Sequence, residues 1–164
     1  MFTKAQALAS MQHECLVIQN LATHMTDAHM DYRPTPGQRS LLELIQYLSV
    51  AAHIVARNIV TGNWDHAAEY SERSKSVTRE NFSAAMDEQQ KAVEECLADF
   101  DGAALAKHET SMPWGTPCTG GEALVNMCLK TLVAYRMQLF LYLKSNGVEI
   151  GTMECWAGMS LPPS

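Results

Sequence analysis

TLVAYRMQLFLYLKSNG, residues 131–147, is the stretch of sequence that decides the fold, because it is typical of the end of a long packed helix. Polar and aromatic residues recur in it at steps of four, three and four, namely Thr131, Tyr135, Gln138 and Tyr142. This spacing places their side chains on one face of a helix. Asn146 and Gly147 then supply a common helix end. We therefore expect a long helix whose inward face carries hydrogen-bonding groups.

Three further helical patterns precede this one. Apolar residues spaced three or four apart predict helices over about 4–25, 41–60 and 79–98, and the last helix is expected to begin near 119. The boundaries have recognisable signals. They are the capping-box pairs Ser40 with Glu43 and Thr119 with Glu122, the N-cap candidate Thr78, and the helix stop Gly62.

The connections between these helices differ in length and character. Residues 31–39 contain two prolines and a glycine, which suits an extended crossover, and residues 63–77 form a polar connection. Residues 103–118 hold two prolines, so we expect at most a short hairpin there, with Trp114 folded back on the end of the helices. These features predict an all-α protein, a four-helix bundle with long crossover connections, in a single domain over 1–164.

Composition narrows the class of protein. The chain has 164 residues, 47% of them apolar, and a net charge of −6 with its 12 Lys and Arg residues scattered, which argues against nucleic-acid binding. The N-terminus lacks the apolar run of a secretory signal, and we expect no membrane-spanning helix. The five cysteines are widely separated and include no Cys-x-x-Cys pair, which favours free thiols in the cytoplasm.

Four motifs occur in a characteristic order along the chain. They are Tyr-Arg-Pro-x-Pro-Gly at 32–37, Arg-Asn-Ile-Val-Thr-Gly at 57–62, Pro-Trp-Gly at 113–115 and Tyr-Arg-x-Gln at 135–138. Together the motifs resemble the DinB-like (DinB/YfiT-type) superfamily. The resemblance implies a DinB/YfiT-like bundle that forms a homodimer. In metal-binding members it also implies three histidines, one on helix two and two on helix four, facing each other at one end.

The metal-binding histidines of that pattern are absent here. Their equivalent positions are Tyr47, Thr131 and Tyr135, none of which is a usual ligand for a catalytic divalent metal. An alignment shifted by one turn offers only His53 on helix two, and helix four has no histidine between Thr119 and Ser145. We therefore expect no metal and no cofactor. If a metal is present, nickel, zinc or iron are the divalent ions to consider.

The replacement residues suggest a different use of the same place. Tyr47, Thr131 and Tyr135, with Gln46, His53 and Gln138 as further lining residues, are expected to form a pocket for a small polar ligand, or a degenerate site closed by the tyrosines. Two alternatives stay open. One is a metal-dependent hydrolase or thiol S-transferase like other members of the superfamily. The other is a structural or interaction module, which a closed space between the two tyrosines would indicate.

Cys118 is the one thiol whose position suggests reactivity. It lies just before the expected N-terminus of helix four, where the helix dipole favours a thiolate and would lower its pKa. No histidine lies near it in the sequence to act as a base, so an incidental position is the alternative.

Overall fold

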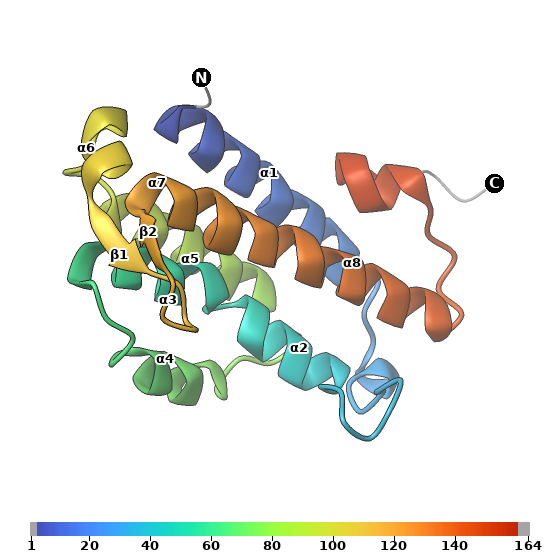
Figure 1. Cartoon of the computed structure of the whole chain (residues 1–164). Helices are drawn as coiled ribbons and strands as arrows, with labels where there is room; N and C mark the ends of the chain where they lie inside the picture. Colours follow the sequence, from blue (N-terminus) through green and yellow to red (C-terminus); the bar gives the residue numbers. More distant parts are fainter. Residues whose placement is uncertain (1–2, 161–164) are drawn as a thin grey trace.

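The computed structural model describes residues 3–160, and four long helical stretches pack side by side in it (Figure 1). The first is α1 (Lys4–Ala22), and the second is divided into α2 (Leu41–Leu48) and α3 (Ala51–Thr61). The third is α5 (Phe82–Cys96). The fourth joins α7 (Gly120–Ala123), a π-helical segment η2 (Leu124–Leu129) and α8 (Lys130–Ser145) into one continuous helix. The prediction of an all-α protein is confirmed.

Contacts among these helices define the core. α1 packs against α5 and α8, α3 packs against α5 and η2, and α2 packs against α8. The stretch Leu41–Thr61 is long and apolar enough to be considered as a membrane span by length and composition. However, 61% of its most apolar window is buried inside the molecule, as is usual for a core helix. Its apolar character therefore serves packing against the neighbouring helices.

The predicted helix boundaries are mostly correct because short-range hydrogen bonds set them. The Ser40 hydroxyl accepts a hydrogen bond from the Glu43 amide at 3.2 Å, and the Glu43 carboxylate accepts one from the Ser40 amide at 2.7 Å. Thr119 and Glu122 repeat the arrangement. Gly62 ends α3 with φ +72°, a conformation that favours glycine. The N-cap prediction for Thr78 was wrong.

Asn81 replaces Thr78 as the residue before the third helix. The Asn81 side chain accepts a hydrogen bond from the Thr78 amide at 2.8 Å, which closes a turn over residues 78–81. α5 therefore begins at Phe82, later than the predicted start.

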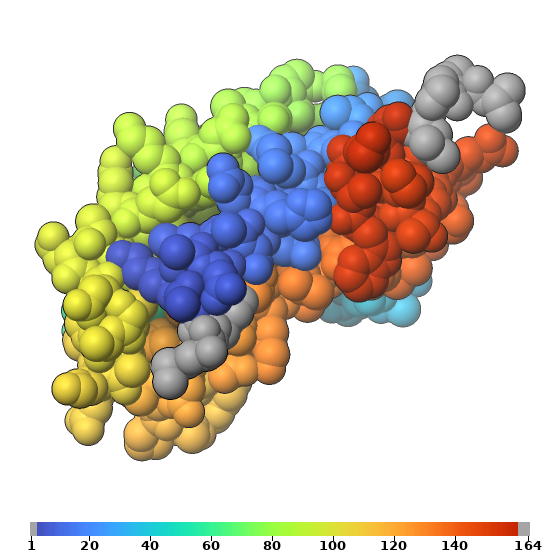
Figure 2. Space-filling model, turned by 90° about the horizontal axis from the view of Figure 1, so that it is seen from above, coloured from blue at the N-terminus to red at the C-terminus, as the bar shows by residue number. Residues whose placement is uncertain are grey.

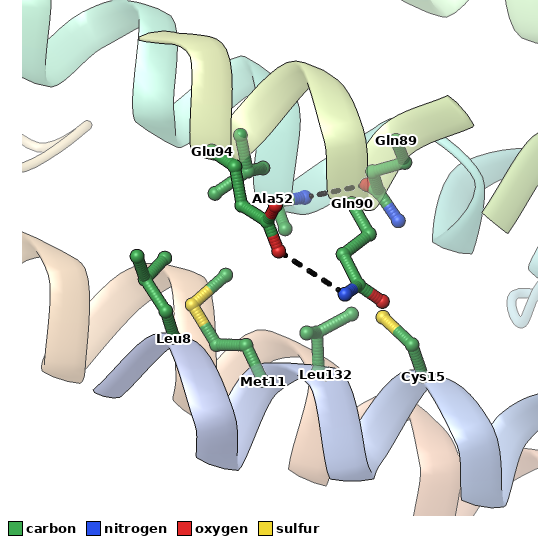
Figure 3. Close-up of a pocket in the computed structure, with 9 residues that line it drawn as sticks. Leu8, Met11, Cys15, Ala52, Gln89, Gln90, Glu94 and Leu132 are labelled. Carbon is green, nitrogen blue, oxygen red and sulfur yellow. Dashed lines mark hydrogen bonds between the residues drawn. The ribbon is translucent and has the colours of Figure 1, made fainter. Parts of the chain in front are cut away.

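The second predicted helix is interrupted at Ser49 and Val50, and a side chain from α5 satisfies the interruption. Gln89 donates a hydrogen bond to the Leu48 carbonyl at 2.8 Å. It also accepts one from the Ala52 amide at 2.9 Å (Figure 3). Gln89 is only 3% exposed, so both of its amide ends are used in the interior. In a continuous helix the Leu48 carbonyl and the Ala52 amide would bond each other, and here the Gln89 side chain bonds both.

Two short helices occur in the predicted connections. α4 (Ala67–Ser74) lies within the expected polar connection. α6 (Gly102–Lys107) follows Asp101, whose carboxylate accepts a hydrogen bond from the Ala104 amide at 2.7 Å. A single 3-10 turn, η1 (Asp27–His29), precedes the proline-containing crossover.

The predicted hairpin is present. Strands β1 (Glu109–Ser111) and β2 (Pro117–Thr119) are antiparallel, with Thr110 opposite Cys118. The expectation that Trp114 folds back was wrong, because its side chain is 70% exposed. It lies at the tip of the turn, next to Gly115 with φ +86°.

The C-terminal segment lies against α1 (Figure 2) and contains the π-helical turn η3 (Met153–Ala157). Arg136 of α8, 1% exposed, holds it in place. The Arg136 guanidinium pairs with Glu14 of α1 at 2.6 Å and donates to the Cys155 carbonyl. It also lies 4.8 Å from the centre of the Trp156 ring. One buried cation therefore joins three segments that are distant in the sequence.

Candidate functional site

Two of the three residues at the expected metal-ligand positions meet in the structure. Tyr47 projects from α2 and Tyr135 from α8, and their ring centres lie 4.8 Å apart with an angle of 63° between the planes. This edge-to-face arrangement is a favourable contact between aromatic rings. Both residues are half-buried. The two rings therefore fill the space between the helices at this level.

Arg39, just before α2, covers both rings. Its guanidinium carbon lies 4.2 Å from the centre of the Tyr47 ring and 5.7 Å from that of Tyr135. Within residues 3–160, no carboxylate pairs with Arg39. We call Arg39, Tyr47 and Tyr135 the arginine–tyrosine cluster. It presents an exposed positive charge without a counter-ion.

A chain of hydrogen bonds from α8 fixes the backbone of this arginine. Gln138 donates to the Tyr142 hydroxyl at 2.6 Å, and that hydroxyl donates to the Arg39 carbonyl at 2.9 Å. Tyr142 is 2% exposed, and its ring packs edge-to-face on Tyr32 at 5.4 Å. Gln138 thus supports the cluster indirectly. The regular spacing of Tyr135, Gln138 and Tyr142 places all three side chains on the face of α8 that contacts the cluster.

The Tyr47 phenol of the cluster is neutral at physiological pH. Burial raises the pKa of Tyr47, and the neighbouring Tyr135 raises it further, while Arg39 opposes the shift. The net direction is upward, so the hydroxyl keeps its proton at neutral pH. Tyr47 can donate and accept hydrogen bonds, but it is not a phenolate nucleophile at that pH.

Thr131 and Gln46 contribute less to the cluster than the sequence suggested. Thr131 is half-buried, one turn before Tyr135, and its hydroxyl has no hydrogen bond to any residue between 3 and 160. The Gln46 amide donates to the carbonyls of Lys75 and Val77, both at 3.2 Å. Gln46 therefore ties α2 to the segment after α4.

His53 belongs to a different group of residues. It lies on α3, beyond the interruption at Ser49 and Val50, and its ring centre is 4.5 Å from that of Tyr70 on α4. The Tyr70 hydroxyl is 3.4 Å from Nε2 of His53. Burial lowers the pKa of His53 to about 4, and the charges of Arg57 and Arg73 add to the effect. His53 is a neutral imidazole at physiological pH.

The residues at the ligand positions do not fit a divalent metal centre. Tyr47 bears a protonated phenol, the rings of Tyr47 and Tyr135 lie under a guanidinium, and Thr131 offers a neutral hydroxyl, whereas such centres need imidazole, carboxylate or thiolate donors. No three His, Cys, Asp or Glu side chains gather at a metal-binding distance anywhere in the described part of the chain.

The prediction of an acidic thiol at Cys118 was wrong. Burial raises the pKa of Cys118, and the negative charge of Glu122 raises it further. The Glu122 carboxylate is held beside the amide of Thr119 by the capping box, so it adds a negative charge near the helix N-terminus. All five cysteines are free thiols, as expected.

The sequence matches no family model and no curated protein, but solved structures share its fold. The DinB-like protein YjoA from Bacillus subtilis has a TM-score of 0.68 and 19% identity, over 90% of this chain and 96% of that one. A DinB-like protein from Bacillus cereus has a TM-score of 0.72 and 15% identity, over 93% and 99%. This chain has the DinB-like fold.

A third DinB-like structure agrees with these two. It comes from Exiguobacterium sibiricum, with a TM-score of 0.67 and 22% identity over 91% of this chain and 95% of that one. All three matches extend over nearly the whole length of both chains. The DinB-like fold therefore extends over nine tenths or more of this chain.

Arg39 and Arg136 are the residues that sequence reasoning missed. Arg39 lies in a proline-containing connection, where no periodic pattern predicts the direction of a side chain. Arg136 lies next to Tyr135, and its partner Glu14 lies 122 residues earlier in the chain, on α1. A charge inside an apolar helical pattern was the available signal, because such charges are rarely fully buried unless they are paired.

Proposed function

We propose that this chain is a metal-free member of the DinB-like superfamily that binds a small anion at the arginine–tyrosine cluster. The observation that carries the proposal is Arg39, whose guanidinium lies on two tyrosine rings without a carboxylate partner among residues 3–160. Its place is the end of the helices where superfamily members are expected to hold a metal. At that place the Arg39 guanidinium, instead of a metal ion, would attract an anionic ligand.

The geometry of a stacked arginine supports this assignment. A guanidinium whose face lies on an aromatic ring keeps its edge N–H groups available, and these donors match the oxygens of a carboxylate or phosphate. The hydroxyl of Thr131 has no partner in the described chain and adds a neutral donor nearby. Because the rings of Tyr47 and Tyr135 are in contact, the anion would lie on the exposed side of Arg39.

A structural or interaction module is the second candidate, and the ring contact favours it. Tyr47 and Tyr135 close the space between α2 and α8 with ring centres 4.8 Å apart. In that case the cluster is a packing feature, and Arg39 stabilises it by a cation–π interaction of about 0.5–1 kcal/mol. Ligand binding separates the two candidates.

Metal content tests the first part of the proposal. Protein purified without a histidine tag should contain far less than one nickel, zinc or iron ion per chain by elemental mass spectrometry. A stoichiometric metal would contradict the proposal and favour a metal-dependent hydrolase or thiol S-transferase.

Anion titration tests the second part. In NMR titrations with acetate and with inorganic phosphate, we expect one of the anions to shift the signals of Tyr47 and Tyr135. Arg39→Ala should weaken that binding by about tenfold, because a charged donor is lost. Arg33→Ala is the matched control, since Arg33 lies in the same connection but pairs with Glu43 at 3.3 Å. Binding of neither anion, or binding unchanged by Arg39→Ala, would favour the interaction module.

Homodimerisation and a cytoplasmic location remain predictions from the resemblance and the composition. Sedimentation analysis of the full chain measures the first directly.

A further inference from the structure

α3, α4 and α5 enclose a groove of about 410 Å3 that lies apart from the arginine–tyrosine cluster. Small-molecule sites in proteins commonly have volumes of about 300–1,000 Å3. Part of the lining is apolar and comes from Val50, Val77, Ala85 and Ala92. The remaining lining is polar, so the groove can hold a ligand with an apolar part and charged groups.

His53 and Tyr70, two side chains in contact, form one wall of the groove. The rings of His53 and Tyr70 are in edge-to-face contact, and a second histidine, His66, contacts Tyr70 with ring centres 5.6 Å apart. Nε2 of His66 is 2.8 Å from the Ile54 carbonyl, which fixes His66 against α3. Tyr70 is therefore held between two imidazoles, and the wall offers hydrogen-bonding groups to a ligand.

Two opposite charges also line the groove, and they do not pair. Arg73 of α4 lies 5.4 Å from the centre of the Tyr70 ring. Glu88 comes from α5. Neither has an ion pair with any residue of the described chain. The other carboxylate in the lining, Glu72, is already bound to Lys75 at 2.5 Å. The groove thus carries one available cation and one available anion on different helices.

We propose that this groove binds a small zwitterion with an apolar side chain, such as an apolar α-amino acid. Its carboxylate would pair with Arg73 and its ammonium group with Glu88. Its side chain would lie on the apolar surface of Val50 and Ala92, beside His53 and Tyr70. This site uses none of the residues of the arginine–tyrosine cluster, so the two proposals succeed or fail separately.

Calorimetric titration with three related compounds tests the requirement for both charges. Phenylalanine carries both charges, N-acetylphenylalanine only the carboxylate, and phenethylamine only the ammonium group. We expect phenylalanine to bind the full chain more tightly than either of the others, by up to about fivefold, because the upper range for one exposed ion pair corresponds to that gain. Equal or weaker binding of phenylalanine would overturn the proposal.

Single substitutions then assign the charges to their partners. Arg73→Ala should weaken phenylalanine binding about fivefold and leave phenethylamine binding unchanged, and Glu88→Gln should leave N-acetylphenylalanine binding unchanged. The controls are Asp87→Asn, because Asp87 of the same helix bonds Gln19 instead, and Arg79→Ala, because Arg79 pairs with Asp27. Phenylalanine binding that is insensitive to both test substitutions would overturn the proposal, whereas a selective loss would support it.

Discussion

Burial determines the chemistry of His53 at the scale of a single residue. Its pKa is about 4 in the folded protein, against an ordinary value of 6.5. The unfolded chain therefore binds more protons at this site between those two pH values. The contribution of the neutral imidazole to stability is fully present above about pH 6.5 and decreases as the pH falls toward 4.

We predict that His53→Gln reduces the pH dependence of stability in this window. The free energy of unfolding of the natural chain should fall more steeply from pH 7 to pH 4.5 than that of the variant, because glutamine takes up no proton. Urea unfolding at several pH values measures both curves. NMR titration of the His53 ring provides a direct check, and a midpoint near 6.5 would contradict the assignment.

At the scale of the helix, Gln89 makes the interruption between α2 and α3 stable. It is the only side chain shown to bond both Leu48 and Ala52 across the gap within residues 3–160. Gln89→Leu would leave a buried carbonyl and a buried amide without these partners. We expect a loss of about 3 kcal/mol in the free energy of unfolding, measured with urea.

Gln90→Leu is the matched control for that substitution. Gln90 is the next residue on α5, and its amide bonds Glu94 of the same helix (Figure 3). The cavity beside both residues is about 10 Å3, so leucine at position 90 meets little free space. The change should be within about 0.5 kcal/mol. A loss as large as that of Gln89→Leu would refute the role assigned to Gln89.

The same element shows what the sequence could predict and what it could not. The capping boxes at Ser40 and Thr119 join residues three apart, so sequence spacing was sufficient to find them. The interruption of the second helix depends on Gln89, which lies 37 residues from Ala52. No pattern within a short stretch of sequence predicts a contact between residues so far apart. The polar helix α4 was missed for a similar reason, because it has few apolar residues and gains its order from α2.

Some residues of the candidate site could also be predicted from the sequence, and others could not. Tyr47 and Tyr135 could be paired in advance because the resemblance aligned their two helices, and their rings are in contact. Arg39 could not be predicted, because its position over the rings depends on the Tyr142 hydroxyl, which anchors its carbonyl from another helix. His53 lies on the second helical stretch, as predicted. However, it comes after the interruption, and its ring contacts Tyr70 of α4 instead of the cluster.

For the whole molecule, Arg136 connects α1, α8 and the C-terminal segment. Its side chain is 2% exposed and that of Glu14 is 13% exposed, so the pair is shielded from water. Arg136→Met should destabilise the protein by about 3 kcal/mol, because the Glu14 carboxylate would be left buried without its cation. Urea unfolding measures the loss, and hydrogen exchange should show faster exchange in residues 153–157.

An exposed arginine serves as the comparison. Arg33 pairs with Glu43, and the two side chains are 40% and 49% exposed. Arg33→Met should change the free energy of unfolding by less than about 1 kcal/mol. Similar effects of the two substitutions would show that Arg136 does not anchor the C-terminal segment.

The interruption at Ser49 and Val50 also bears on how this protein can evolve. Tyr47 precedes it and His53 follows it, and each contacts a different neighbouring helix. Gln89 of α5 bridges the two parts where the backbone bond between Leu48 and Ala52 is missing. We therefore expect substitutions around Tyr47 and substitutions around His53 to be accepted independently of each other.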